Sequence, residues 1–220
     1  MAMAELAETY QKLYSRYGPQ SWWPTSYGLR PWQWEVCVGA VLTQNTGWRN
    51  VERALANLAG ARCLTAVDVL KIPASGLQAL VRPAGYFRQK AQRLKSLAEL
   101  VLAFGSVGSF LRHVTRERLL AVHGIGPETA DCILLYAAGR PEFVVDAYTR
   151  RAFSRLGLLT GNESYGQIRQ MFEAELPRDA RLFNEYHALI VRLGKELCRK
   201  LPNCIGCPLR NSCMYGREVG

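Results

Sequence analysis

The sequence predicts an all-α protein. Apolar residues recur at three- and four-residue spacing through most of the chain, few segments alternate with a period of two, and no fixed repeat or long linker interrupts the pattern. With 220 residues, of which 49% are hydrophobic, the chain is long enough for one large domain or two small lobes around a hydrophobic core.

The expected helices follow from this periodicity and from residues that begin or end a helix. Leu6, Leu13 and Tyr17 lie on one face of a first helix, which ends at the following glycine. Thr65 caps a short helix that stops at Pro73. The other expected helices cover residues 34–46, 48–58, 86–105, 116–122, 127–138, 147–156, 165–176 and 180–197.

The charge balance points to a class of partner. Basic residues outnumber acidic ones by 28 to 18, which gives a formal net charge of +10. This favours a polyanion, nucleic acid above all, and the alternative is a solvated basic surface that serves solubility. The N-terminus has no basic region followed by an apolar block, and no stretch reaches about eighteen uninterrupted apolar residues. We expect a cytoplasmic protein, nucleoid-associated if prokaryotic, with no membrane partner.

A glycine-flanked turn, Gly124-Ile125-Gly126, stands between two expected helices. Pro127 suits the first position of the second helix because it has no amide hydrogen to leave unpaired. Two glycines allow a tight turn whose N–H groups, together with the positive end of the new helix, suit a phosphate oxygen. The alternative is an ordinary connection between helices.

The seven cysteines fall into two groups, and without a secretion signal we expect no disulfide framework. Cys37, Cys63 and Cys132 lie singly among apolar neighbours and are expected to be small core residues. The other four form a C-x5-C-x2-C-x5-C pattern: Cys198, Cys204, Cys207 and Cys213. Four thiolates this close predict a metal site that suits either zinc or an iron-sulfur cluster.

Three features occur in an order that resembles a known family. "LLAVHGIGPETADCIL" and "FVVDAYTRR", followed by the cysteine cluster, resemble the helix-hairpin-helix DNA glycosylases of the endonuclease III superfamily, over about Trp34 to Cys213. The resemblance implies a two-lobed fold: residues 30–143 as a six-helix lobe with the hairpin, and residues 1–29 plus 144–220 as a second lobe with a cluster loop at 198–213. It also implies a [4Fe-4S] cluster, although the first cysteine spacing is one residue shorter than the common family pattern.

The resemblance assigns the catalytic role to Asp146, the single acid at the end of a short apolar connector. Cleaving an N-glycosidic bond builds positive charge on the sugar, and an ionised carboxylate near the anomeric carbon stabilises that cation and orients a water. The alternative, compatible with catalysis, is an N-cap for the helix that begins at residue 147.

One position departs from family members that also cut the DNA strand. Where they carry a nucleophilic lysine, this chain has Glu128, and a carboxylate forms no Schiff base. We therefore expect a monofunctional glycosylase. Glu128 is expected to interact with the helix dipole, and a share in catalysis is the alternative.

Within the superfamily, the chain resembles the endonuclease III-like 3-methyladenine DNA glycosylases. The matching stretches are "WWP", "VGAVLTQNTGW", "VRPAGYFRQKAQRL" and the hairpin with its glutamate. This implies removal of alkylated purines, with Trp22, Trp23 and Trp48 as the base pocket, because a cationic base stacks well on indole rings. The alternative is that these tryptophans fill the core. Some of these relatives lack the cluster, which is a further departure.

The expected partner is double-stranded DNA with damaged bases, bound by a monomer. Gln44 matches the family's glutamine that fills the gap left by a flipped base, unless it is only a polar residue at a helix end. The hairpin contacts are expected to be Gly124, Ile125, Gly126 and Thr129, with a monovalent cation as a further candidate ligand there. Candidate phosphate contacts, each of which can equally be a solvated charge, are Lys90, Arg93, Lys95, Arg199, Lys200 and Arg210.

The favoured hypothesis is thus a monofunctional base-excision glycosylase for alkylated purines. A second hypothesis keeps the fold but changes the substrate to oxidised or mismatched pyrimidines, with weak lyase activity. A third is a damaged-DNA-binding protein without catalytic activity.

Overall fold

The computed structural model describes residues 2–219, and this range contains helices, turns and bends but no β-strand, which confirms the all-α prediction. The α-helices are α1 (Ala2–Tyr17), α2 (Trp32–Leu42), α3 (Trp48–Gly60), α4 (Ala66–Lys71), α5 (Ala74–Val81), α6 (Phe87–Ala103), α7 (Val107–His113), α8 (Arg116–Leu120), α9 (Pro127–Cys132), α10 (Ala147–Leu156), α11 (Tyr165–Glu175), α12 (Ala180–Glu196) and α13 (Met214–Glu218). Shorter elements are the 3-10 turns η1 (Arg82–Ala84) and η3 (Arg210–Ser212) and the π-helical turn η2 (Ile133–Ala137).

Two compact units make up the chain, residues 1–22 with 140–220 and residues 23–139. We had expected boundaries after residues 29 and 143. Within the described range no single helix is long and apolar enough to cross a membrane, and α6 and α7, which meet at 85°, reach those limits only when taken together.

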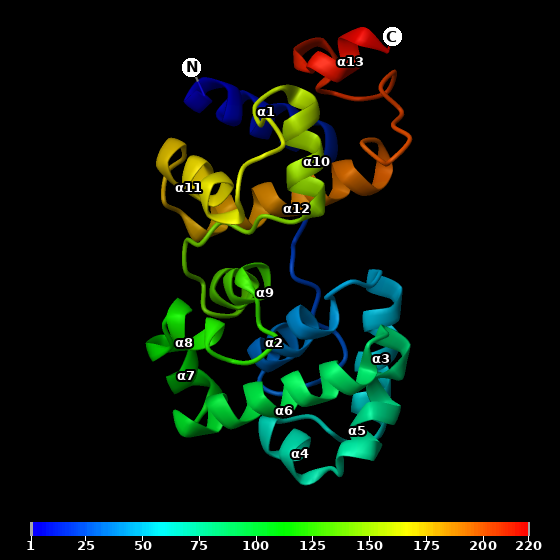
Figure 1. The fold of residues 1–220 in the computed structure, drawn as a ribbon, viewed down its shortest axis with the longest axis vertical. Helices are drawn as coiled ribbons and strands as arrows, with labels where there is room; N and C mark the ends of the chain where they lie inside the picture. Colours follow the sequence, from blue (N-terminus) through cyan, green and yellow to red (C-terminus); the bar gives the residue numbers. More distant parts are fainter. Residues whose placement is uncertain (1, 220) are drawn as a thin grey trace. The chain divides into compact units, whose positions relative to one another are not determined.

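In the unit of residues 23–139, α2 is central, and α3, α6, α9 and η2 pack around it (Figure 1). Every residue of 34–42 is buried, and apart from Glu35 and Gly39 these residues are apolar, as is typical of a helix surrounded by the core. Glu35 is 1% exposed, and its carboxylate accepts N–H bonds from three backbone amides within residues 26–29. These hydrogen bonds offset the free-energy cost of burying the carboxylate, and they hold the preceding segment against α2.

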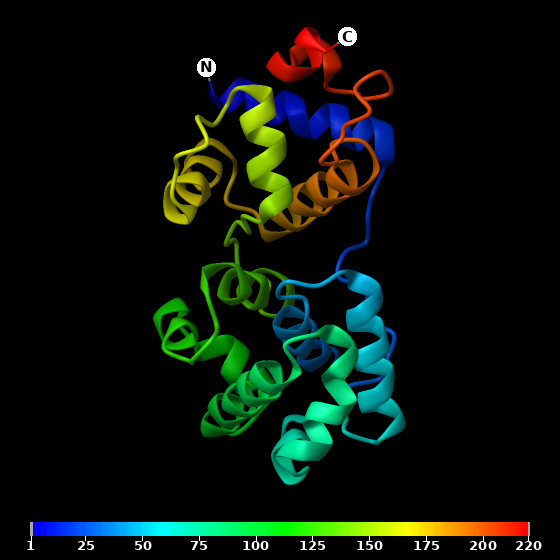
Figure 2. The same cartoon turned by 45° about the vertical axis from the view of Figure 1, so that its right-hand side comes forward.

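In the other unit, α1 and α10 both pack on α12 (Figure 1, Figure 2). Aromatic rings form its core. Phe143 stacks on Phe172 with ring centroids 3.9 Å apart, and both side chains are fully buried. The hydroxyl of Tyr186 on α12 donates to the carbonyl of Leu6 on α1 at 2.8 Å. Burial of one such aromatic side chain stabilises the fold by about 1.5–3 kcal/mol. The cluster therefore holds the neighbouring helices firmly against α12.

The structure corrects several expected helix boundaries. α2 ends at Leu42 rather than at residue 46, because Thr43 turns its hydroxyl onto the carbonyl of Gly39 and Asn45 has a left-handed φ of 52°. The helix expected at 127–138 becomes a π turn from residue 133 onward. Helices α5, α7 and α13, with 8, 7 and 5 residues, were not predicted.

Candidate active site

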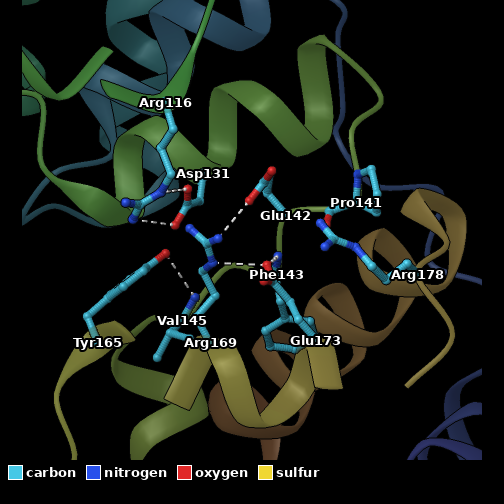
Figure 3. Close-up of polar contacts among 10 residues, drawn as sticks. All are labelled: Arg116, Asp131, Pro141, Glu142, Phe143, Val145, Tyr165, Arg169, Glu173 and Arg178. Carbon is cyan, nitrogen blue, oxygen red and sulfur yellow. Dashed lines mark hydrogen bonds and ion pairs between the residues drawn. The ribbon is translucent and has the colours of Figure 1, made fainter. Parts of the chain in front are cut away.

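An extended segment delivers Asp146 to the start of α10. Side chains of α11 hold this segment in place (Figure 3). The N–H of Phe143 donates to the carboxylate of Glu173 at 2.9 Å. The N–H of Val145 contacts the hydroxyl of Tyr165 at 3.4 Å. The backbone just before the acid is therefore anchored by hydrogen bonds as well as by the aromatic core.

Both carboxylate oxygens of Asp146 have a neighbour. Oδ1 accepts the N–H of Thr149 at 2.7 Å and its hydroxyl at 3.0 Å, which confirms the N-cap prediction. Oδ2 lies 3.7 Å from Nε2 of His187 on α12. Burial pushes the pKa of Asp146 upward, but His187 and Thr149 together outweigh it, so this pKa lies below its ordinary value. The side chain is 13% exposed, and the site thus presents an ionised carboxylate to solvent.

The glycine turn joins α8 to α9 as predicted. Gly124 has a φ of +80°, and a Cβ added there would overlap the side chain of Arg93 on α6. Gly126 has an extended backbone and open space around it. Ile125 points inward, with 3% of its surface exposed, and its N–H donates to the carbonyl of Val122. The backbone N–H groups of the two glycines therefore remain the candidates for a phosphate.

Gln44 lies against this hairpin. Its Nε2 donates to the carbonyl of Gly124 at 3.0 Å and to the hydroxyl of Thr129 at 2.8 Å, and its Oε1 accepts from the guanidinium of Arg93. Thr129 is only 5% exposed, so little of its side chain is accessible to DNA, and its contact with DNA stays a prediction. Insertion of Gln44 into DNA would break these hydrogen bonds. Its role in filling the gap left by a flipped base stays a prediction.

Lys90 is not a phosphate contact, contrary to expectation, because it is completely buried. Its ammonium donates to the carbonyls of Leu42 and Ala84 at 2.9 and 2.7 Å, at the ends of α2 and η1. Burial, followed by the charge of Arg93, lowers the pKa of Lys90 to about 8. Lys95 caps α4 in a similar way, through three carbonyls within residues 69–72.

Two of the expected pocket tryptophans contact each other. Trp23 and Trp48 meet edge to face with ring centroids 5.3 Å apart. Tyr136 on η2 lies 5.2 Å from Trp23 and completes a group of three rings, which sequence reasoning missed because the π turn leaves no clear mark on the periodicity. Trp22 belongs to the other unit, where the ammonium of Lys195 lies 5.6 Å from the centre of its ring.

Comparison with known proteins decides the family. A family model described as "HhH-GPD superfamily base excision DNA repair protein" matches residues 38–178. The chain belongs to this superfamily. The resemblance inferred from the sequence is confirmed, and the protein is a DNA glycosylase of base excision repair.

Individual proteins similar to this chain include one relative by sequence and two solved structures. "Putative DNA repair glycosylase MJ1434" of Methanocaldococcus jannaschii is 43% identical over 211 residues, which cover 93% of this chain and 94% of that protein. The H. pylori 3-methyladenine DNA glycosylase MagIII, solved with 1,N6-ethenoadenine, is 32% identical with a TM-score of 0.77, over 89% of this chain and 97% of that one. An endonuclease III trapped on DNA has a TM-score of 0.82 over 99% and 98% of the two chains, and at 19% identity it shows the fold alone.

The glycosylase's four C-terminal cysteines line one pocket: Cys198, Cys204, Cys207 and Cys213. Burial, together with the neighbouring thiols, raises the pKa of Cys207 and of Cys213. Arg155 on α10 lies beside them, with Nη1 3.3 Å from Sγ of Cys198 and further bonds to the carbonyls of Arg199 and Lys200. Within residues 4–219, no three His, Cys, Asp or Glu side chains are arranged to hold a single metal ion.

Other residues that the sequence predicts for the site lie at the surface. Glu128 is exposed on the first turn of α9, and the side chains of Arg199 and Lys200 are exposed beside the cysteines. Tyr86, to which sequence reasoning gave no role, is the N-cap residue before α6, with a left-handed φ of 44° and 63% of its surface exposed. An exposed ring before a basic helix suits stacking on an unpaired base. By contrast, Cys37, Cys63 and Cys132 are buried as predicted.

Proposed function

We propose that this glycosylase hydrolyses the N-glycosidic bond of alkylated purines, 3-methyladenine first among them, and leaves an abasic site with the strand intact. The observation that carries the proposal is the ionised carboxylate of Asp146 at the N-terminus of α10, held by Thr149 and faced by His187. The similarity to MagIII, named for 3-methyladenine and 32% identical to this chain, supports the choice of base.

The chemistry requires one charged group in the right place. As the bond between C1′ and the purine nitrogen breaks, its electron pair goes to the cationic base, which leaves as neutral 3-methyladenine. Positive charge then develops on C1′ and the ring oxygen, where the Asp146 carboxylate stabilises it. A water oxygen adds to C1′ and loses a proton to solvent, which completes the hydrolysis.

An aromatic pocket suits this leaving group. A cationic purine stacks on electron-rich rings with a gain of about 0.5–2 kcal/mol, and we assign this role to Trp23 and Trp48, with Trp22 as the third candidate. Tyr136 supports Trp23 from η2. A base that already carries positive charge needs little acid catalysis, which is consistent with a site built around one carboxylate.

Glu128 supports a monofunctional reaction. At this exposed position a lysine would attack C1′ as an amine, and a carboxylate does not. The hairpin, through the N–H groups of Gly124 and Gly126, is proposed to bind the DNA backbone together with the exposed Arg199 and Lys200. A monomer, the cytoplasmic location and a monovalent cation at the hairpin stay predictions.

We propose that the cysteine pocket holds a [4Fe-4S] cluster. A zinc ion gathers four ligands around one point, whereas each thiolate of a [4Fe-4S] cluster binds a different iron. Four thiols that line one pocket supply the donor set that such a cluster needs. Its expected role is to hold the C-terminal loop with its exposed basic side chains.

A product assay tests the proposal. Duplexes with one alkylated purine, one oxidised pyrimidine or one mismatch are incubated with the protein, and the free bases are identified. Release of 3-methyladenine, with no borohydride-trapped adduct on abasic DNA, is the expected result. Release of a pyrimidine with a trapped adduct supports the endonuclease III-like alternative, and binding without any free base supports a non-catalytic protein.

A further inference from the structure

His187 reaches the candidate catalytic carboxylate from a different helix. It lies on α12, the helix on which both α1 and α10 pack, and next to Tyr186, whose hydroxyl is bonded to α1. Its side chain is 7% exposed, and Nε2 lies 3.7 Å from Oδ2 of Asp146. A buried imidazole on a fixed helix is a rigid neighbour for this oxygen.

The two oxygens of Asp146 thus have neighbours on two different helices, Thr149 on α10 and His187 on α12. Thr149 bonds only to Oδ1, and it does so from α10 itself. A carboxylate anchored at one oxygen still rotates about its last bond, because that torsion is broad and roughly two-fold. A neighbour 3.7 Å from Oδ2 on another helix limits this rotation. Since Oδ1 is occupied by the N-cap, Oδ2 is the better placed oxygen to face a substrate.

We propose that His187 is a positioning residue, which fixes the plane of the Asp146 carboxylate so that Oδ2 faces the sugar. The inference rests on the proposed function of Asp146. His187 itself touches no reacting atom, and its effect on base release passes entirely through the carboxylate. A rotated carboxylate would still cap α10, but it would stabilise the sugar cation less well.

The test is a double-mutant cycle under single-turnover conditions, on a duplex that the wild-type protein is shown to cleave. The variants are His187→Leu, His187→Gln, Asp146→Asn and the two double variants. His113→Gln is the matched control, because His113 is exposed and bonds only within its own helix turn. Duplex affinity and the unfolding temperature are measured for each variant.

We expect His187→Leu to slow base release about tenfold, the size of one lost contact to a charged group, with unchanged duplex affinity. His187→Gln, which keeps a donor, should recover part of the rate. In the Asp146→Asn background neither change should slow release further, because residues that act through one another are not additive.

Equal multiplicative losses in both backgrounds would overturn the inference, as would full activity of His187→Leu. If the leucine variant does not fold, the glutamine cycle gives the same decision. A wild-type protein that releases no alkylated purine would instead contradict the proposed function, and its own substrate would then be used for the cycle.

Discussion

Arg116 on α8 and Asp131 on α9 form a bidentate ion pair across the hairpin, with Nε 2.7 Å from Oδ1 and Nη2 3.1 Å from Oδ2 (Figure 3). Asp131 is fully buried, and the Arg116 side chain is 25% exposed. The pair fixes the two helices that flank the glycine turn. It thereby sets the direction in which the turn presents its N–H groups.

Asp131→Asn should destabilise the protein by about 1.5–3 kcal/mol, because it removes the charge from a buried, hydrogen-bonded pair. The matched control is Glu196→Gln, which breaks the exposed pair with Arg192 and should cost about 0–1 kcal/mol. Urea unfolding measures both. Similar losses for the two variants would show that the hairpin pair contributes no more than a surface contact.

The two hairpin glycines should respond differently to alanine. At Gly124 the positive φ costs about 1–2 kcal/mol for an L-residue, and overlap with Arg93 adds to this. At Gly126 a Cβ meets nothing within 4 Å, so stability should not change. If Gly126 nevertheless binds phosphate, Gly126→Ala should weaken duplex binding at unchanged unfolding free energy. Normal binding by this variant would argue against a backbone phosphate contact there.

Lys90 should make stability depend on alkaline pH. Its pKa is about 8 in the folded protein and 10.5 in the unfolded chain, so between these values the unfolded chain binds more protons. The free energy of unfolding should therefore rise from pH 8 to pH 10.5, and this contribution is lost as the pH falls through 8. Lys90→Met should remove the rise. Urea unfolding measures the free energy of unfolding of both proteins across this pH range. If it changes with pH in the same way in both, Lys90 is not the source of the rise.

The cysteine pocket should hold about four iron atoms per chain with matching sulfide. Cys204→Ala should lose the iron and the visible absorption, whereas Cys63→Ala, at a buried cysteine outside the pocket, should keep both. Arg155→Gln removes the contact to Cys198 and should alter the cluster's reduction potential. Stoichiometric zinc, or no metal after anaerobic purification, would rule the cluster out.

The sequence predicted those parts of the site in which the interacting residues are close together along the chain. Asp146 caps α10 because an aspartate before a helix bonds to an amide three residues on, and Thr65 caps α4 for the same reason. The neighbour of Asp146 at Oδ2 was not predictable in this way. His187 approaches it only because α12 packs on α10, and no local pattern records that packing.

Some wrong predictions could have been avoided from the sequence pattern itself. The charge of Lys90 predicts a phosphate contact at the surface, yet the residue shares the face of α6 that carries Leu94, Leu97 and Val101, all fully buried. Residues three or four positions apart lie on the same face of a helix, so this spacing alone would have predicted that Lys90 is buried. Tyr136 was less accessible to such reasoning, because a π turn shifts the register of the residues that follow α9.

The most direct test of the account is base release by Asp146→Asn, measured in single turnover with the duplex affinity of the same preparation. Loss of the charge at unchanged shape should slow release of the alkylated purine by about a hundredfold or more, with binding largely retained. Release at the wild-type rate would contradict the claim that this carboxylate stabilises the sugar cation.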